Sequence, residues 1–452
     1  MPEVRAEQRL LTGWGGTSPT AATVVPGDVD LASTVSQPHP RGVLARGLGR
    51  SYGDAAQNSG GLVIDPSPGS VELLQDGSAR VSAGTDLHTL IRAVLPRGWF
   101  VPVTPGTRYV TIGGAIACDV HGKNHHRAGS FGAHVRSLDL VTADGSSRTL
   151  RPDDHDPRVQ EQFWATVGGM GLTGVITSAV ISLTPVQSGH MVVDTERTAD
   201  LDDVMVRLRE ADRSHTYTVA WVDATARGRH LGRSVITLGE HAGTDELPRQ
   251  LRGRGPTLPE SPRAEFPFTP PVGLITPLTA RAFNEMWYRK APRHRTGEIQ
   301  TIGAFFHPLD GVRHWNRVYG SRGLVQYQFV VPDGAEQTLV AVLEHFTRAE
   351  APCFLSVLKR FGPANPAPLS FPMPGWTLAL DVPASPRLGA LLQKLDRLVL
   401  EAGGRLYLAK DARAGAQAVR QMYPRLEEFE KVRARMDPDR VFRSDLARRL
   451  GL

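Results

Sequence analysis

The stretch Cys118–Gly132 gathers several residue types that take part in chemistry. It reads CDVHGKNHHRAGSFG, with three histidines, one lysine and one aspartate among glycines. His121 and His125 have the i, i+4 spacing of a helical zinc site, but no glutamate follows His121 and no third ligand is apparent. The sequence therefore predicts no metal site. His121 and Lys123 are better placed to meet a cofactor ring or an anionic substrate, whereas His125 and His126 can equally serve the core or the surface.

Two glycine-rich loops indicate an anion-binding backbone. Residues 47–53 read GLGRSYG, and residues 168–174 read GGMGLTG. Successive glycine N–H groups can turn toward one pyrophosphate. The second loop contains G-x-G-x-x-G, but the residues after it, VITSAVISL, favour a strand where the Rossmann fingerprint needs a helix. Each loop alone could be a tight turn. Together with residues 104–126 they predict three backbone cradles for one large phosphate-bearing cofactor.

Lysine is scarce in this chain. Of the 52 basic residues six are lysines, which leaves 46 arginines. A lysine ammonium is compact and titratable, so a lysine in an arginine-rich chain is expected where that chemistry is needed. Three of the six, Lys123, Lys359 and Lys410, lie in the motifs described here.

Length and composition indicate a folded protein of more than one core. A chain of 452 residues exceeds the size of one hydrophobic core, which predicts two domains or one domain with a large insertion. The net charge of +6 comes without a dense basic run, so nucleic acid is not expected, while phosphate groups or an anionic membrane surface stay open. Cys118 and Cys353 form no metal or disulfide motif. We expect no signal peptide and no transmembrane helix.

The elements that must position these residues change character near Ser188. Before it, residues 79–84 predict a strand, residues 86–98 a helix capped by Asp86, and residues 135–152 a hairpin. After it, residues 190–212 predict a strand and an amphipathic helix, and residues 324–332 and 376–383 predict strands of a second sheet that carries helices. The Pro/Gly-rich residues 251–277 predict a loop, and residues 416–438 predict helices.

Several of these segments together carry a family resemblance. They read ARGLGRSYGD, PGTRYVTIGGAIACDVHGKNHH, GSFG, FWATVGGMGLTG, LVQYQFV, FGPANPAPLSFPMPGW and GGRLYLAKDAR. They resemble the vanillyl-alcohol-oxidase-like family of FAD enzymes, and within it the actinobacterial branch that oxidises decaprenylphosphoryl-β-D-ribose. The glycine loops indicate the wider family, whereas HGKNHH, QYQF and AKDAR are typical of the branch. The resemblance covers nearly the whole chain.

The resemblance implies an α+β fold of the PCMH/VAO type with two domains. A split FAD-binding domain, residues 1–187 and 405–452, carries an inserted substrate domain, residues 188–404, built on an antiparallel sheet. FAD would be bound non-covalently, with residues 46–54 at the pyrophosphate, 104–123 along the ribityl chain and ring, and 168–175 on the adenine side. The implied cofactor-binding residues are Arg46, Gly47, Leu48, Gly49, Arg50, Ser51, Tyr52, Gly53, Thr107, Ile112, Gly113, Gly114, Ala117, Cys118, His121, Gly122, Asn124, Gly171, Gly174, Val175, Ile176, Tyr407 and Lys410.

The implied reaction is oxidation of the ribose C2 hydroxyl to a 2-keto sugar, with hydride transfer to flavin N5. It would be the first half of an epimerisation to decaprenylphosphoryl-arabinose for cell-wall arabinan, completed by an NAD(P)H-dependent keto-reductase. Lys410, His121 and Tyr52 would be catalytic, and Lys410 could stabilise charge or relay the proton. The implied substrate-binding residues are Lys123, Trp221, Gln326, Gln328, Lys359, Thr377, Ala379 and Lys410.

Two positions depart from the branch pattern. Ala379 stands where the mycobacterial enzymes carry a cysteine, the one that nitroaromatic inhibitors trap. Without that thiol, such compounds are expected to bind reversibly at best. Thr377 replaces an asparagine, which changes the polarity of the pocket but not the expected reaction.

Two other functional classes are also compatible with the motifs. One is a soluble sugar-alcohol or aldonolactone oxidase of the same FAD family, and the other is a non-catalytic flavin-binding or lipid-carrier module. Simple polyols would be turned over only by the first of these. The lipid-linked substrate implies a peripheral membrane surface as a partner, with a cytoplasmic or a cell-envelope location both compatible with the resemblance.

Overall fold

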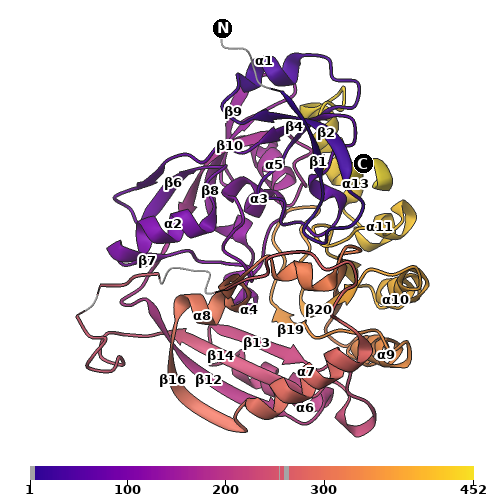
Figure 1. Cartoon of the computed structure of the whole chain (residues 1–452). Helices are drawn as coiled ribbons and strands as arrows, with labels where there is room; N and C mark the ends of the chain where they lie inside the picture. Colours follow the sequence, from indigo (N-terminus) through magenta and orange to yellow (C-terminus); the bar gives the residue numbers. More distant parts are fainter. Residues whose placement is uncertain (1–5, 254, 259–263) are drawn as a thin grey trace.

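Residues 7–182 contribute two small sheets, drawn in indigo and purple in Figure 1. The computed structural model describes residues 6–253, 255–258 and 264–452. In the first sheet, of order β1-β2-β4-β3, β4 pairs in parallel with β2 and β3; the second, of order β5-β6-β10-β8-β9, is antiparallel. The strands are β1 (Glu7–Leu11), β2 (Thr20–Pro26), β3 (Val43–Ala45), β4 (Leu62–Asp65), β5 (Val71–Leu73), β6 (Ser78–Ser82), β8 (Val135–Val141), β9 (Ser147–Leu150) and β10 (Val175–Ser182).

An eight-stranded sheet forms the other large layer of the molecule. Its order is β16-β12-β14-β13-β19-β20-β18-β21, and every neighbouring pair is antiparallel. Its strands are β12 (His190–Thr198), β13 (Tyr217–Val222), β14 (Ser234–His241), β16 (His294–Thr301), β18 (Leu324–Pro332), β19 (Ser356–Phe361), β20 (Gly375–Pro383) and β21 (Arg405–Leu406).

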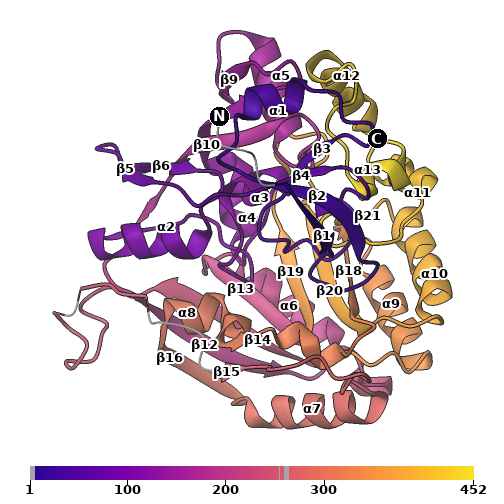
Figure 2. The same ribbon diagram turned by 45° about the horizontal axis from the view of Figure 1, so that its top comes forward.

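Alternation along these strands gives the sheet two different faces. On β18, Tyr327 and Phe329 belong to the hydrophobic core, whereas Gln326 and Gln328 point the other way. The core face carries α6 (Leu201–Ala211), α9 (Gln337–Arg348) and α10 (Leu388–Glu401), whose leucines join the same core. The opposite face is turned toward the N-terminal elements (Figure 2). The polar side chains of the sheet are therefore presented to the glycine loops.

The C-terminal helices return to the N-terminal elements. α11 (Ala416–Met422), α12 (Leu426–Met436) and α13 (Asp445–Leu450) follow β21, and α12 contacts α5 (Pro157–Thr166). Phe442 bridges to Val43 of β3, and Arg449 forms ion pairs with Asp54 and Asp411. Segments at opposite ends of the chain thus share one body.

The remaining elements are short, apart from α2 and α7. They are α1 (Leu31–Ser36), α2 (Leu87–Val94), α3 (Ile112–Ala117), α4 (His125–Ala128), α7 (Pro277–Lys290), α8 (Ile302–Phe306), β7 (Trp99–Phe100), β11 (Thr184–Pro185), β15 (Ala264–Glu265), β17 (Val312–Arg313), and the 3-10 turns 54–56, 95–97, 131–134, 228–230, 308–311 and 315–319. Among the described residues, no helix is both long and apolar enough to cross a membrane.

The mixture of helices and antiparallel sheets confirms the predicted α+β class. The predicted helix after Asp86 is α2, whose first turn is capped by that side chain accepting from Thr89 N. The hairpin at 135–152 is also present as β8 and β9. The predicted loop at 251–277 lies partly outside the described residues; within it, β15 pairs with β17, and α7 begins at its end.

Candidate active site

A large cavity lies between the glycine loops and the polar face of the eight-stranded sheet. Its volume is about 1080 Å³, at or above the ~300–1,000 Å³ of ordinary small-molecule sites. It therefore has room for a dinucleotide and a second ligand. All residues predicted to contact cofactor or substrate line it, except Gly53, Ile112, Asn124 and Thr377.

The cofactor side of the cavity is built largely from backbone. A Cβ on Gly47 would lie 2.4 Å from Thr111 Oγ1, and Gly49 and Gly171 have φ of +63° and +74°. The Thr111 hydroxyl accepts from Gly114 N at 3.1 Å, which holds the start of α3 against the first loop. Glycine at these positions allows a close approach that a side chain would block. This wall fits a phosphate-bearing cofactor.

Two arginines stabilise the first loop. Arg46 donates to the Thr12 and Ala56 carbonyls at 2.7 and 2.5 Å. Arg50 donates to the Tyr109 carbonyl at 3.1 Å and stacks 4.0 Å from the Trp14 ring centroid. Burial lowers the pKa of both groups from the ordinary arginine value. The guanidinium groups of both arginines bond to backbone carbonyls, while other parts of both side chains line the cavity.

His121 stands at the junction of the two walls. Its ring is buried among aromatic rings, with centroids 4.8 Å from Phe361 and 5.2 Å from Tyr407. Burial, followed by the charges of Lys359, His125 and Lys410, holds its pKa well below the usual histidine range. The ring is therefore neutral. Gln328 Nε2 lies 3.0 Å from Nε2 of the ring, and Nδ1 has no partner among the described residues.

Tyr52, Tyr407 and Lys410 lie together beside the first loop. Lys410 Nζ is 4.0 Å from the Tyr52 ring centroid, and the Tyr407 hydroxyl donates to the Cys118 carbonyl at 2.7 Å. Burial lowers the pKa of Lys410, and the nearby Asp381 carboxyl opposes that shift. Burial raises the pKa of Tyr52 well above its usual value, so this phenol stays protonated. A titratable ammonium thus faces the cavity beside a hydroxyl donor.

The three lysines singled out in the sequence all line this cavity. Burial and then the charge of Lys410 lower the pKa of Lys359 to about 8. Burial and then the charge of Lys359 lower that of Lys123 to about 7. Lys123 Nζ donates to the Phe305 carbonyl and lies 4.2 Å from the Phe305 ring centroid. Cations that depress one another's pKa favour a bound anion, which would relieve their repulsion.

Strand register aligns the predicted substrate residues. Gln328 lies opposite Ala379 in the β18–β20 pair, and Ala379 lies opposite Val357 in the β19–β20 pair. Trp221 of β13 lies opposite Val357 and donates through Nε1 to the Phe354 carbonyl at 2.9 Å. On the same face, polar side chains of four adjacent strands line the cavity, and we call them the polar strip: Gln326 and Gln328 of β18, Asp381 of β20, Lys359 of β19 and Trp221 of β13.

Asp381 is a site residue that the sequence interpretation missed. It is fully buried, lies opposite Gln326 in register, and accepts a hydrogen bond from the Gln326 amide. Its Oδ2 has no partner among the described residues. Burial raises its pKa, against the effects of Gln326 and Lys410. The period of two on β20 could have found it, because it lies two residues beyond Ala379.

Asp119 is a second missed residue, and it organises the His121 turn. Its carboxylate accepts from Gly132 N at 2.9 Å, from the Ser130 hydroxyl at 2.8 Å and from Asn365 at 2.7 Å. Asp119 itself has φ of +40°, an uncommon value for a residue other than glycine. The buried carboxylate therefore ties two loops to the turn that carries His121.

Four predicted contacts lie outside the cavity lining. Ile112 is a buried core residue, and Asn124 donates to the Pro102 carbonyl at 2.8 Å. A Cβ on Gly53 would lie 2.0 Å from the Asp411 carbonyl, and the Thr377 hydroxyl donates to the Phe329 carbonyl at 2.9 Å. Each of these supports the wall from behind.

No cluster of three or more metal-ligating side chains occurs in the part of the chain that the structure describes. His121 is close to Gln328, as above, and His125 Nδ1 accepts from Gly362 N at 3.1 Å. Burial and then the charge of Lys359 lower the pKa of His125 to about 3. Both rings are therefore neutral and held by other groups.

Comparison with known proteins agrees with this geometry. Residues 21–151 match the FAD binding domain family, and residues 381–450 match the D-arabinono-1,4-lactone oxidase family. The chain is 46% identical over 454 residues to decaprenylphosphoryl-beta-D-ribose oxidase of Mycolicibacterium smegmatis, with 98% of each chain covered. It is 43% identical over 378 residues to an uncharacterized protein in mprA 5'region of Streptomyces coelicolor, covering 81% of this chain and 100% of that one. An alditol oxidase of a Streptomyces species is 28% identical over 155 residues, covering 32% of this chain and 36% of that protein.

The whole-length similarity and the FAD-binding match confirm the resemblance seen in the motifs. FAD is the cofactor, and the glycine-walled cavity fits it. The chain belongs to the decaprenylphosphoryl-beta-D-ribose oxidase family of vanillyl-alcohol-oxidase-like FAD enzymes.

Proposed function

We propose that the protein oxidises the ribose C2 hydroxyl of decaprenylphosphoryl-β-D-ribose to the 2-keto sugar, the reaction that the name of its Mycolicibacterium relative indicates. The observation that carries this proposal is the polar strip of the sheet, which places two glutamines, Asp381 and Lys359 across the cavity from the glycine loops. When bound, FAD supplies a hydride acceptor at flavin N5. The chain must bind the sugar, orient C2 and take up the hydroxyl proton.

The residues of the chain divide these tasks. Lys359 and Lys123 would bind the phosphate, because both are cations that gain from an anion. Gln326 and Gln328 would bind sugar hydroxyls through their amides. Lys410 would hold or move the hydroxyl proton, because its lowered pKa makes a neutral amine accessible near neutral pH.

The division of the chain into two domains belongs to the same proposal. Residues 1–187 and 405–452 would bind FAD, and residues 188–404 would bind the substrate. The return of Phe442 and Arg449 to the N-terminal strands supports this division, and so does the single sheet, whose strands from β12 to β20 all lie within residues 188–404. Only its edge strand β21, at residues 405–406, lies beyond the boundary. We also propose that FAD is held without a covalent bond, because Nε2 of His121 lies against Gln328.

The chemistry of the product implies partners. A 2-keto sugar becomes an epimerised alcohol only after a second, reductive step, so we propose an NAD(P)H-dependent keto-reductase as the consumer of the product. The complete epimerisation would yield decaprenylphosphoryl-arabinose for cell-wall arabinan. A substrate with a polyprenyl tail also implies a peripheral contact with a membrane surface.

A second candidate rests on one comparison. Residues 381–450 match a D-arabinono-1,4-lactone oxidase model, which favours oxidation of a soluble sugar lactone or sugar alcohol. Such substrates carry no phosphate, so the lysines of the cavity would have no anion to bind. The two candidates therefore differ in their need for Lys359.

An anaerobic titration tests the proposal. FAD-loaded protein is mixed with a polyprenylphosphoryl ribose or with simple polyols and lactones, and the flavin absorbance is followed. We expect bleaching by the lipid-linked sugar, lost in Lys410→Ala and retained in the exposed control Lys431→Ala. Bleaching by polyols or lactones alone would instead assign the second candidate.

A further inference from the structure

Helix α7 (Pro277–Lys290) has its polar and apolar sides reversed. Its two fully buried positions, Ala280 and Asn284, are small or polar, and Phe283 beside them is only half-buried, against Phe354. The helix begins with a capping box in which Thr276 and Thr279 bond each other's backbone. A surface helix of a globular protein normally buries its large apolar side chains. In α7 large apolar side chains are exposed, so their exposure needs another explanation.

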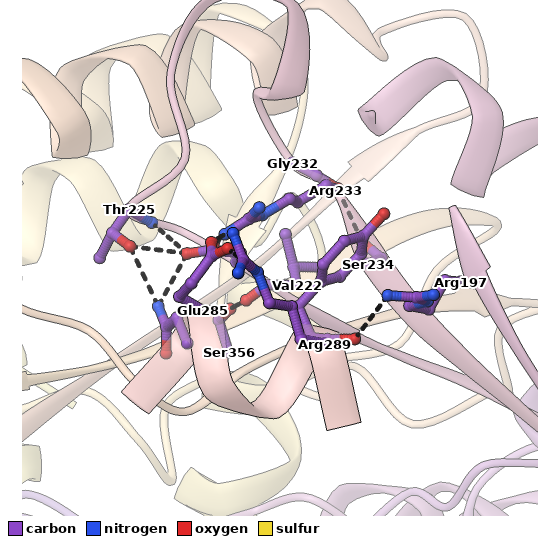
Figure 3. Close-up of polar contacts among 12 residues, drawn as sticks. Arg197, Val222, Thr225, Gly232, Arg233, Ser234, Glu285, Arg289 and Ser356 are labelled. Atoms are coloured by element: carbon purple, nitrogen blue, oxygen red, sulfur yellow. Dashed lines mark hydrogen bonds and ion pairs between the residues drawn. The ribbon is translucent and has the colours of Figure 1, made fainter. Parts of the chain in front are cut away.

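A buried polar cluster stabilises α7 on the sheet (Figure 3). Asn284 Nδ2 donates to Asp223 at 2.8 Å and to the Cys353 carbonyl at 3.0 Å. Arg233 donates to Asp223 at 2.8 Å and to Glu285 at 2.5 Å. The bonds of the buried Asn284 and Asp223, together with the pair between Arg233 and the partly exposed Glu285, fix the orientation of the helix. The outward direction of its apolar side chains is therefore defined by the anchor.

The outward side carries large apolar residues. Leu278 is 77% exposed and Met286 is 55% exposed, and both lie at four-residue spacing from Ala282 on one face. The preceding segment adds Phe268 and Val272, which are 64% and 76% exposed. We call these four large residues, with Leu274 and Trp287, the apolar rim. Large apolar side chains that gather on one exposed helix and the segment before it indicate an interaction site.

The preceding segment is held in place beside α7. Leu274 N donates to the Val318 carbonyl at 2.9 Å, and Ser321 N donates to the Pro270 carbonyl at 3.1 Å. A Cβ on Gly273 would lie 2.3 Å from the Tyr319 carbonyl. The backbone of the rim is therefore bonded to the rest of the domain and not a free loop.

The apolar rim is continuous with the mouth of the cavity. Trp287 belongs to both, and Phe283, which stacks on Trp287 with ring centroids 5.9 Å apart, also lines the cavity. Val312 and Trp315 line it from the neighbouring segment. An apolar chain attached to a ligand in the cavity would meet Phe283 and Trp287 where it leaves the cavity.

The charge on α7 indicates which partner fits the rim. The helix carries Arg281, Arg289 and Lys290 against one acidic residue of its own, Glu285, which is paired with Arg233 and Arg289, while Arg281 pairs with Glu350 outside the helix. Basic residues that flank exposed Leu, Met and Trp side chains are the composition of interfacial helices that bind anionic membranes. A protein partner or a second copy would not need this excess of positive charge.

We propose that the apolar rim docks on an anionic lipid bilayer and places the cavity mouth at the lipid surface. The purpose of this docking rests on the proposed lipid-linked substrate. The test of docking measures vesicle binding and does not depend on turnover. Leu278 and Met286 would enter the apolar edge of the bilayer, and the α7 cations would meet the headgroups. The substrate could then reach the cavity while its tail stays in lipid.

Flotation of the FAD-loaded full chain with vesicles tests the proposal. The vesicles contain phosphatidylcholine alone or phosphatidylcholine with phosphatidylglycerol. We expect binding to the anionic vesicles, weakened at least about tenfold in a Leu278→Asp/Met286→Asp double variant. The matched control is Leu10→Asp/Val206→Asp, which changes two exposed apolar residues away from the rim and should bind like the wild type.

Two results would overturn the proposal. One is that the wild type does not bind the anionic vesicles, or that the rim variant and the control variant bind them equally well. The other is a wild-type dimer in sedimentation velocity that the rim variant alone dissociates, which would assign the rim to a second copy. Turnover of a short-chain polyprenylphosphoryl ribose in detergent separates this proposal from the catalytic one. A rim variant with normal turnover and normal vesicle binding contradicts docking only, whereas bound protein without turnover contradicts the reaction.

Discussion

The two walls of the cavity are made in different ways. The loop wall is built from backbone, where Gly47, Gly49 and Gly171 permit close approach. The sheet wall uses side chains, with Gln328, Lys359 and Asp381 at inward-facing positions of three strands. A backbone wall fits phosphates shared by many cofactors, whereas a side-chain wall can be changed residue by residue. Cofactor choice and substrate choice are therefore separable in this fold.

The largest effect is expected from filling the backbone wall. Gly47→Val should weaken FAD binding by up to about a hundredfold, because the new side chain would overlap Thr111 and overpacking costs roughly 1–3 kcal/mol. The affinity for FAD is measured by flavin fluorescence during titration of the apoprotein. Gly389→Val is the control, because a Cβ there meets no atom within 4 Å. Equal FAD affinity in the two variants would show that the loop does not touch the cofactor.

A smaller effect is expected from neutralising the carboxylate in the sheet wall. Asp381→Asn should lower kcat roughly tenfold, because the orphaned Oδ2 could no longer accept from the substrate as an anion. The pKa of Asp381 is raised by burial, so wild-type activity should fall with decreasing pH above the usual carboxyl range. The pH–rate profile measures this, and the variant should lose that acidic limb.

The control for this prediction is another buried carboxylate. Asp223→Asn alters the α7 anchor outside the cavity, so it should lower stability while it leaves the acidic limb in place. An Asp381→Asn profile that matches the wild type would remove Asp381 from the reaction.

Lys359 should connect substrate affinity to pH. Its pKa of about 8 means that it loses its proton as pH rises through that value, and the phosphate then loses a cation. KM for the lipid-linked sugar should rise roughly three- to tenfold between neutral and alkaline pH. Lys359→Arg stays charged, so it should flatten the rise of KM with pH. The pH dependence of kcat that comes from proton uptake by Lys410 should persist in this variant. Lys394→Arg, at an exposed position, should behave like the wild type.

The smallest effect on turnover is expected at Ala379. Ala379→Cys should change kcat less than about twofold, because the residue is small and its neighbours Gln328 and Val357 keep their positions. The variant should nonetheless form a covalent adduct with a nitroaromatic inhibitor under turnover, and the wild type should form none. Intact mass spectrometry checks both. An adduct on the wild type would place the reactive group on another residue.

The difference between the walls also explains what the sequence could predict. Glycine spacing marks a backbone cradle directly, so the loops at 47–53 and 168–174 could be located without a structure. Lys359 and Lys410 were predicted from the family resemblance of their motifs, and the scarcity of lysine added weight to both. Asp381 was missed, because an aspartate near a strand end looks like a turn residue until its register places it opposite Gln326. The reversed α7 was also not predicted, since its anchor depends on Asp223, far away in the chain.

The return of the C-terminal helices to the N-terminal strands affects the order of events during synthesis. Arg449 bonds Asp54 across 395 positions of the chain, and Phe442 bridges to Val43 of β3. Contacts at such separation close late in folding. The first glycine loop leaves the ribosome early, but the side chains that brace it from the far end are made last. We therefore expect the flavin to be captured after synthesis, and a ribosome-bound nascent chain that lacks its last helices should emerge colourless.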